Sequence, residues 1–218
     1  ELLKIERIEK YYGSKSNLTK AIDGISFNVE KGEFTAIMGA SGSGKTTLLN
    51  CISTIDRVTS GHIWLENTDI TTLKGKELNK FRREKLGFIF QDFNLLDTLT
   101  AYENIALALS IQKFPANEID KAVNTVAEQL EITSVLKKYP YQMSGGQKQR
   151  MSIARAIARK PEILIFDDSF SALDYKTDRV LRETLAKSCK DSTRIIVAQR
   201  IGTIRDADRI IVLEDGKI

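Results

Sequence analysis

Residues 39–46 read GASGSGKT, and they directly follow an apolar run, Phe34–Met38. A glycine-rich turn between a short apolar strand and a helix matches the pattern of a phosphate-binding loop. Its glycines allow backbone N–H groups to turn inward around phosphate oxygens, and the N-terminus of the following helix adds a positive dipole. We therefore predict a buried strand over 34–38, a phosphate-binding loop and a helix over 45–53.

Two side chains at the end of this loop carry the predicted chemistry. Lys45 can reach the β- and γ-phosphates of a nucleotide, and the hydroxyl of Thr46 can ligate Mg²⁺. The alternative, a glycine-rich turn that arises by chance, is disfavoured by the strand before it and the helix after it. The nucleotide-binding residues predicted from this segment are Gly39, Ser41, Gly42, Ser43, Gly44, Lys45, Thr46 and Thr47.

A second segment, residues 162–168, is an apolar run that ends in two acids, Asp167 and Asp168. Such a strand places a carboxylate at the edge of the sheet, and we expect that edge to lie beside the phosphate-binding loop. Asp167 is then the acid that holds Mg²⁺, directly or through water. Taken alone, the segment also fits a buried strand that ends in a solvated acidic turn; the phosphate-binding loop upstream favours the metal site.

A third segment, SGGQ, lies between the other two and precedes a predicted helix. Its members are Ser144, Gly145, Gly146 and Gln147. The serine hydroxyl, the glycine amides and the start of the helix form a second anion-binding surface. Because this surface has no lysine, it suits the γ-phosphate of a nucleotide already held elsewhere. The segment resembles the signature motif of the ABC ATPases, with Met143 where the family usually has leucine.

This resemblance covers essentially the whole chain and implies further roles. In ABC ATPases the signature surface faces the phosphate-binding loop of a partner subunit. Tyr12 matches the aromatic residue that stacks on adenine; Tyr11 is the adjacent alternative, and a tyrosine that only packs in a strand is the other interpretation. Gln91 matches the glutamine that touches Mg²⁺ and borders the membrane-domain contact. Asp174, at the end of residues 171–174, matches the D-loop, which crosses the dimer interface.

Two positions depart from the pattern of an efficient ATPase of this family. Asp168 stands where the family has a glutamate as general base, and its side chain is shorter by one C–C bond, roughly 1.5 Å. Gln199 replaces a histidine; it can hydrogen-bond a γ-phosphate but cannot gain or lose a proton near neutral pH. Losing well-placed acid–base groups typically slows a reaction by about 10²–10⁴-fold. We expect tight ATP binding and slow hydrolysis, with Asp168, Gln199, Gln91 and Lys45 as the catalytic residues.

The remaining apolar runs predict an α/β protein. Strands are predicted over 2–8, 22–29, 62–66, 86–90, 163–166, 194–198 and 210–213, and helices over 104–111, 118–130 and 146–159. The resemblance implies a P-loop NTPase (RecA-like) core, about 1–91 and 161–218, with an N-terminal antiparallel β subdomain. An α-helical subdomain, about 92–160, is inserted into this core. Residues 1–218 thus form one ABC ATP-binding domain.

The composition limits the partners of the chain. Of 218 residues, 33 are Lys or Arg and 29 are Asp or Glu, a net charge of +4, and the basic residues are scattered. A solvated surface of mixed sign is therefore favoured over nucleic-acid binding. No run approaches the roughly 18 apolar residues of a membrane helix, so we expect association with the cytoplasmic face of the membrane only through transmembrane permease domains. Cys51 and Cys189 are expected to be reduced thiols.

The resemblance changes along the chain. Up to about Arg150 the sequence is similar to the ATPase subunits of bacterial peptide-antibiotic and lipoprotein exporters, and residues 90–104 are especially similar to the bacitracin-type branch. From about Met151 it is similar to the degenerate-site half of heterodimeric multidrug exporters. Together with Glu1 in place of a start methionine and an abrupt end at Ile218, this change prompts the hypothesis of a recombinant of two ABC domains. A natural exporter domain is the alternative.

These observations predict an ABC transport ATPase. It binds ATP and Mg²⁺, works as a homo- or heterodimer with permease domains, and powers export of a peptide, lipid or drug. The alternative is a nucleotide-gated clamp or scaffold with negligible turnover, which Asp168 and Gln199 favour. A soluble ABC ATPase of translation or DNA repair is disfavoured because this sequence has neither a second cassette nor a long coiled-coil insertion. A P-loop kinase leaves residues 144–147 without a role.

Overall fold

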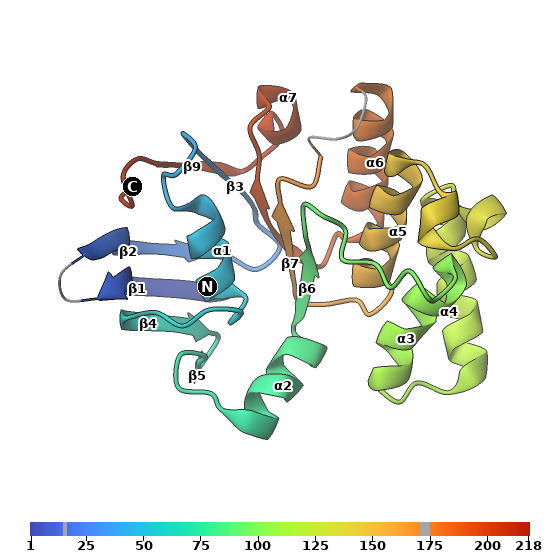
Figure 1. The fold of residues 1–218 in the computed structure, drawn as a ribbon, viewed down its shortest axis with the longest axis horizontal. Coiled ribbons are helices and arrows are strands. Elements are labelled where there is room, and N and C mark those ends of the chain that lie inside the picture. Colours follow the sequence, from blue (N-terminus) through green and yellow to red (C-terminus); the bar gives the residue numbers. More distant parts are fainter. Residues whose placement is uncertain (15–16, 171–174) are drawn as a thin grey trace. The chain divides into compact units, whose positions relative to one another are not determined.

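The computed structural model describes residues 1–14, 17–170 and 175–218, and its contacts divide the chain into two units (Figure 1). The first unit comprises Glu1–Arg82 and Thr193–Ile218, and the second comprises Arg83–Ser192. The predicted helical subdomain, about 92–160, falls within the second unit, and its bounds stay a prediction. Asp174 lies outside the described residues.

An antiparallel sheet with strand order β2-β1-β4-β5 occupies the first unit (Figure 1). Its strands are β1 Leu3–Ser14, β2 Asn17–Val29, β4 Ser60–Leu65 and β5 Thr68–Asp69. Leu3 and Ile5 alternate with exposed or half-buried residues, as expected where only one face of a sheet is covered. A β-bulge at Arg7, with φ 44°, then returns Ile8 to the buried face.

The first unit also contains three parallel strands. They are β3 Phe34–Gly39, which lies between β8 Thr193–Val197 and β9 Arg209–Leu213. The near-continuous apolar run of β3 is buried, as is typical of a strand covered on both faces. Because β3 and β8 are parallel, the segments that follow them emerge at the same edge of the sheet. Helix α1, Lys45–Ile52, follows β3. This unit also contains α7 Ile201–Ile204 and all but the last two residues of α2 Gly75–Glu84.

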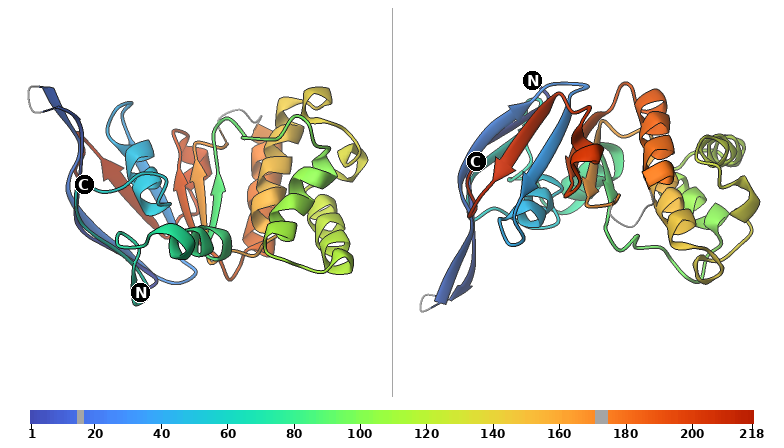
Figure 2. Two further views of the ribbon diagram at one scale, coloured as in Figure 1. Left: turned by 60° about the horizontal axis from the view of Figure 1, so that its bottom comes forward. Right: turned by 90° about the horizontal axis from the view of Figure 1, so that it is seen from above.

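The second unit combines a parallel strand pair with helices (Figure 2). Strand β6, Leu86–Ile89, pairs with β7, Ile163–Asp167. Its helices are α3 Ala101–Ile111, α4 Ala116–Gln129, α5 Gly145–Ile157 and α6 Tyr175–Ser188, with short 3-10 helices at Thr133–Val135 and Pro140–Gln142. Helices α3, α4 and α5 pack on one another. Met151, Ala154 and Ile157 on α5 are buried, and so is Ala158 at its C-cap.

Several predicted element bounds were wrong in an instructive way. Strand β1 continues to Ser14 rather than ending at residue 8, and β2 begins at Asn17 rather than at residue 22. The added residues are mostly exposed and polar, so backbone pairing of β1 with β2 supports them without an apolar pattern. Helix α2 was not predicted because Phe81 is its single buried residue. Among the described residues, no helix combines the length and apolarity needed to cross a bilayer.

Candidate nucleotide-binding site

Glycines fix the path of the loop between β3 and α1. Gly39 and Gly44 have φ angles of 151° and 103°, in the region that residues with a Cβ disfavour. A Cβ on Gly39 would collide with the carbonyl oxygen of Leu213, and one on Gly44 would come within 2.5 Å of the carbonyl oxygen of Ala21. At Gly42 an added Cβ would meet nothing within 4 Å. Two glycines therefore allow close packing of the loop, and the third leaves its backbone open to a ligand.

The N-terminus of α1 fits an anionic ligand. The first N–H groups of any helix have no partner within the helix, and a side-chain cap normally accepts from one of them. Gly44 occupies the N-cap position of α1 and provides no such cap, and the first turn carries no acid. Helices α3 and α5, in contrast, both begin with a capping box. The start of α1 thus presents donors and a positive dipole of the kind that binds phosphate.

Lys45 lies over the loop that precedes it. Its Nζ donates hydrogen bonds to the carbonyl oxygens of Gly39, at 2.8 Å, and Ala40, at 2.6 Å. The hydroxyl of Ser43 lies 3.4 Å from the same nitrogen. The ammonium is therefore held at the loop, where it adds a full positive charge to the N–H donors. Of the neighbouring predicted residues, Ser41 and Thr46 are exposed and Thr47 is half-buried.

Tyr12 is the better placed of the two candidate adenine contacts. Tyr12 and Tyr11 are adjacent on β1 and so point to opposite faces of the strand. Tyr12 is 42% exposed, and its hydroxyl donates a 2.7 Å hydrogen bond to the carboxylate of Asp56, which follows α1. Burial and this hydrogen bond raise the pKa of Tyr12 to about 12, and a hydrogen bond with Thr47 acts in the opposite direction. Tyr12 is therefore linked to the helix that begins at the phosphate-binding loop.

Gln199 follows β8 and is exposed. Strand β8 runs parallel to β3, with Val197 opposite Ile37, so Gln199 and the phosphate-binding loop leave the sheet at the same edge. The sequence predicted that Gln199 hydrogen-bonds the γ-phosphate. Its role stays a prediction.

The predicted acids and Gln91 meet at one edge of the second unit. Strands β6 and β7 pair in parallel through Ile89 and Phe166, so Gln91 after β6 and Asp167 at the end of β7 share that edge. The hydroxyl of Ser169 donates a 2.9 Å hydrogen bond to the carbonyl oxygen of Ile89 and fastens the two strand ends together. The side-chain oxygens of Gln91 and Asp167 are of the kind that Mg²⁺ prefers, and their role as metal ligands together with Thr46 stays a prediction.

Asp168 has an unusual backbone. Its φ angle is 45°, in the left-handed region, and the residue is only 9% exposed. Aspartate tolerates this conformation better than most residues with a side chain. A left-handed residue directly after a buried strand changes the direction of the chain. The backbone conformation at Asp168 therefore sets the direction of its short side chain.

The SGGQ segment begins α5 with a capping box. The hydroxyl oxygen of Ser144 accepts a 3.3 Å hydrogen bond from the backbone N–H of Gln147, and the Gln147 side-chain oxygen accepts a 3.0 Å bond from the backbone N–H of Ser144. An added Cβ on Gly145 would meet nothing within 4 Å, and Gly146 is half-buried. The serine cap and the open glycine backbone are compatible with the predicted anion-binding surface, whose role stays a prediction.

Comparison with known proteins identifies the family. Residues 22–171 match the family model described as ABC transporter.

The chain belongs to the ABC transporter family.

The bacitracin export ATP-binding protein BceA of Halalkalibacterium halodurans is 46% identical over 219 residues, which cover 100% of this chain and 87% of BceA. The ABC transporter ATP-binding protein YxdL of Bacillus subtilis is 42% identical and covers 100% of this chain, which spans 85% of YxdL. The methionine import ATP-binding protein MetN 1 of Bacillus cereus is 39% identical, and this chain spans 63% of it.

Solved structures agree with this assignment. A dimeric structure of the ATP-binding cassette MJ0796, in a post-hydrolysis state bound to ADP and Pi, has a TM-score of 0.93 and 37% identity. The match covers 100% of this chain and 96% of the cassette. The predicted fold class is confirmed: this is the P-loop fold of ABC ATPases, with an antiparallel β subdomain and a parallel-sheet α/β core.

Membership of the ABC transporter family also establishes the cofactors and the class of activity. ABC ATPase domains bind ATP with Mg²⁺, dimerise, and couple ATP hydrolysis to transport with transmembrane permease components. The hypothesis of a recombinant gains no support, because BceA and YxdL each match the entire chain. The similarity to a degenerate-site half gains none either.

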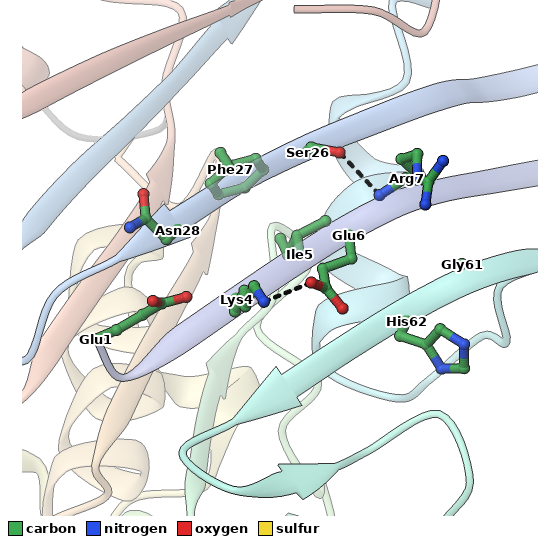
Figure 3. A pocket seen from close by; sticks show the side chains of 10 residues that line it. All are labelled: Glu1, Lys4, Ile5, Glu6, Arg7, Ser26, Phe27, Asn28, Gly61 and His62. Atoms are coloured by element: carbon green, nitrogen blue, oxygen red, sulfur yellow. Dashed lines mark hydrogen bonds and ion pairs between the residues drawn. The ribbon is translucent and has the colours of Figure 1, made fainter.

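A hollow of about 850 Å³ lies on the antiparallel sheet (Figure 3), and none of the residues that line it is a predicted nucleotide contact. Two of its charged side chains, Lys4 and Glu6, form an ion pair with each other. The backbone N–H of Arg7 donates a 2.8 Å hydrogen bond to the hydroxyl of Ser26. This hollow lacks a glycine-rich loop and a helix N-terminus, so its size does not make it the nucleotide site.

Proposed function

We propose that the chain is the ATP-hydrolysing cassette of a transporter that exports a peptide, lipid or drug. The observation that carries this proposal is the contrast between two helix N-termini. Helix α1 has no side-chain cap and begins with Lys45, whereas α5 is capped by Ser144 and the segment 144–147 contains no lysine. The first suits a whole nucleotide, and the second suits a γ-phosphate that another chain presents.

We infer that two cassettes enclose two ATP molecules, each held by residues 39–46 of one chain and 144–147 of the other. Lys45 and the loop N–H groups offset the charge of the β- and γ-phosphates. Bound Mg²⁺ supplies further charge neutralisation, and Thr46, Gln91 and Asp167 are its predicted ligands. Ser144 and the glycine N–H groups donate to the γ-phosphate, and Asp174 belongs to the loop that crosses between the chains.

Export, rather than import, is supported by the similarity to BceA, a bacitracin export ATP-binding protein of which this chain spans 87%. MetN 1, an import protein, is spanned to only 63%. The chain itself supplies force and timing, while permease partners carry the substrate across the membrane. We place the cassette at the cytoplasmic face of the membrane, attached through those partners, with residues 92–160 as the helical subdomain.

We further propose that hydrolysis at this site is slow. The water-activating carboxylate is Asp168, which is one C–C bond shorter than a glutamate and has a φ of 45°. Gln199 is exposed at the edge from which the phosphate-binding loop emerges, but its amide cannot take up or release a proton near neutral pH. A nucleotide-gated clamp with negligible turnover is the second candidate function, and these same two residues favour it.

The test is ATP binding and turnover in the presence of Mg²⁺. Lys45→Ala removes charge-assisted hydrogen bonds, so ATP affinity should fall roughly 10- to 100-fold. Lys31→Ala is the control, because Lys31 is exposed in the turn before β3. ATP binding that survives Lys45→Ala unchanged would overturn the site.

A dilution series tests the shared site. If each ATP lies between two chains, turnover per chain falls as the protein is diluted below its dimerisation range. Equal turnover per chain across a wide series contradicts the proposal. Binding without any turnover at high protein concentration selects the clamp.

A further inference from the structure

The carboxylate of Asp56 connects two side chains of β1 to the end of α1. Its Oδ2 accepts a 2.7 Å hydrogen bond from the hydroxyl of Tyr12, and its Oδ1 accepts one of 2.7 Å from Nζ of Lys10. Asp56 lies 44 residues away from Tyr12 in sequence, in the segment between α1 and β4. No motif in the sequence marks this acid.

Lys10 is placed against the ring of Tyr12. Its Nζ lies 4.8 Å from the ring centroid, within the range of a cation–π interaction. The Lys10 side chain is only 12% exposed, and its Nζ also donates a 2.7 Å hydrogen bond to the carbonyl oxygen of Arg57. The Tyr12 ring is thus held at its hydroxyl by Asp56 and at one face by Lys10.

Asp56 is itself fixed to α1. Its backbone N–H donates a 3.1 Å hydrogen bond to the carbonyl oxygen of Asn50, in the last turn of that helix. Burial tends to raise the pKa of Asp56, but hydrogen bonds from Lys10, Tyr12 and the Arg57 N–H outweigh it and lower that pKa below its usual range. The carboxylate therefore stays ionised and keeps both side-chain bonds at neutral pH.

We propose that Asp56 is a positioning residue for the nucleobase. It locks the Tyr12 ring in a fixed relation to α1, the helix that begins at Lys45 and Thr46. The distance between the base-stacking ring and the phosphate-binding loop is then set before nucleotide arrives. This inference rests on the proposed role of Tyr12 as the adenine contact.

The lock lowers the entropy cost of binding. An exposed tyrosine that moves freely must be immobilised when a base stacks on it, which costs enough to weaken binding roughly two- to tenfold. Asp56 and Lys10 immobilise the Tyr12 ring when the protein folds, so this entropy is not lost again on binding. Removing the carboxylate should therefore weaken ligands that have a base and leave base-free ligands unaffected.

The experiment compares ATP with inorganic tripolyphosphate, which offers phosphates and no base. We expect Asp56→Ala to reduce the ratio of ATP affinity to tripolyphosphate affinity roughly two- to tenfold. Asp56→Asn can still accept a hydrogen bond from Tyr12, so it should reduce this ratio by less than Asp56→Ala does. Asp69→Ala is the matched control, because Asp69 accepts comparable bonds from His62 and Thr71 at β5. It should leave the ratio unchanged.

A second variant keeps the proposal testable if Asp56→Ala unfolds. Tyr12→Phe retains the ring and removes the hydroxyl, so it should lower the ratio in the same way. In the Tyr12→Phe background, Asp56→Asn should then add less than it does alone, since Tyr12→Phe has already removed the hydrogen bond that Asp56→Asn weakens. Full additivity, or equal losses for ATP and tripolyphosphate, would overturn the proposal.

The outcome separates this inference from the function on which it rests. If wild-type protein binds neither ATP nor tripolyphosphate, the proposed nucleotide site fails. If it binds both through Lys45 but Tyr12→Ala leaves the affinity ratio unchanged, Tyr12 is not the base contact, and the positioning role of Asp56 is refuted while the phosphate site stands.

Discussion

The hydroxyl of Ser144 accepts from the backbone N–H of Gln147, and within the part of the chain that the structure describes it donates to no acceptor. The capping box of α3 differs in this respect, because the hydroxyl of Thr100 donates a 2.7 Å hydrogen bond to the carboxylate of Glu103. A glutamine at the third helical position thus leaves the capping hydroxyl able to donate to a phosphate.

The two caps give a matched pair of variants. Ser144→Ala and Thr100→Ala each remove an N-cap and should each lower the free energy of unfolding by about 0.5–2 kcal/mol. Only Ser144→Ala also removes a γ-phosphate donor, so only it should slow ATP turnover. Chemical denaturation and a steady-state ATPase assay measure the two effects. Equal loss of turnover in both variants would show that α5 contributes stability alone.

Gly145→Ala should raise the stability of the protein and lower its ATP turnover. Gly145 is helical, and an added Cβ meets nothing within 4 Å, so alanine should stabilise the folded state by roughly 0.5–1 kcal/mol. The same methyl group occupies the surface that a phosphate approaches. We expect a higher melting temperature together with slower turnover at saturating ATP. Turnover at the wild-type rate would place the phosphate elsewhere.

Restoring the acid–base groups should accelerate hydrolysis. Asp168→Glu lengthens the carboxylate by one C–C bond, and Gln199→His provides a group that titrates near neutral pH. The double variant should turn over ATP on the order of 10²-fold faster than the wild type. Asp168→Asn, which removes the base, is the control and should not gain. If the double variant dimerises but shows no gain, another step limits the rate.

Cys51 should be an unreactive thiol. It is 3% exposed, and burial, followed by the charge of Asp56, raises its pKa to about 11. An ordinary cysteine has a pKa near 8.5, so alkylation of Cys51 at pH 8 should be on the order of 10²-fold slower than that of a model thiol. Peptide mapping after iodoacetamide treatment measures this. Rapid labelling of the folded protein would contradict the burial.

The raised pKa of Cys51 should also make the stability of the protein depend on pH in alkaline solution. The unfolded chain loses the Cys51 proton near pH 8.5, whereas the folded chain keeps it until about pH 11. The unfolded state therefore binds fewer protons in this range, and stability should fall between pH 8.5 and 11. Cys51→Ala should make the unfolding free energy less dependent on pH there.

Sequence patterns predicted the parts of the fold where burial and backbone chemistry act together. The run Phe34–Met38 is buried as β3, and the helix after Gly44 begins at Lys45. Outlying elements were missed because little of their sequence is buried. Beyond Ile8, β1 is supported by pairing with β2, and α2 buries Phe81 alone. Such elements have no regular spacing of apolar residues from which a strand or helix could be predicted.

The candidate site shows the same division. Residues inside contiguous motifs, such as Lys45 and Ser144, could be assigned because the structure around them is formed by residues that are adjacent in sequence. The Asp56 carboxylate could not, since its partners Lys10 and Tyr12 lie on a strand more than forty residues earlier. The left-handed backbone of Asp168 was also invisible in sequence, because a strand followed by an acid fits several conformations.

The three contacts of the Lys45 ammonium with its own loop bear on selectivity. Because the carbonyl oxygens of Gly39 and Ala40 already accept hydrogen bonds from this ammonium, a ligand must exchange hydrogen bonds with it as well as interact with its charge. A small monovalent anion offers one bond in return and gains little. A polyphosphate can bond several loop amides at once, so we expect the loop to favour it over chloride and bicarbonate.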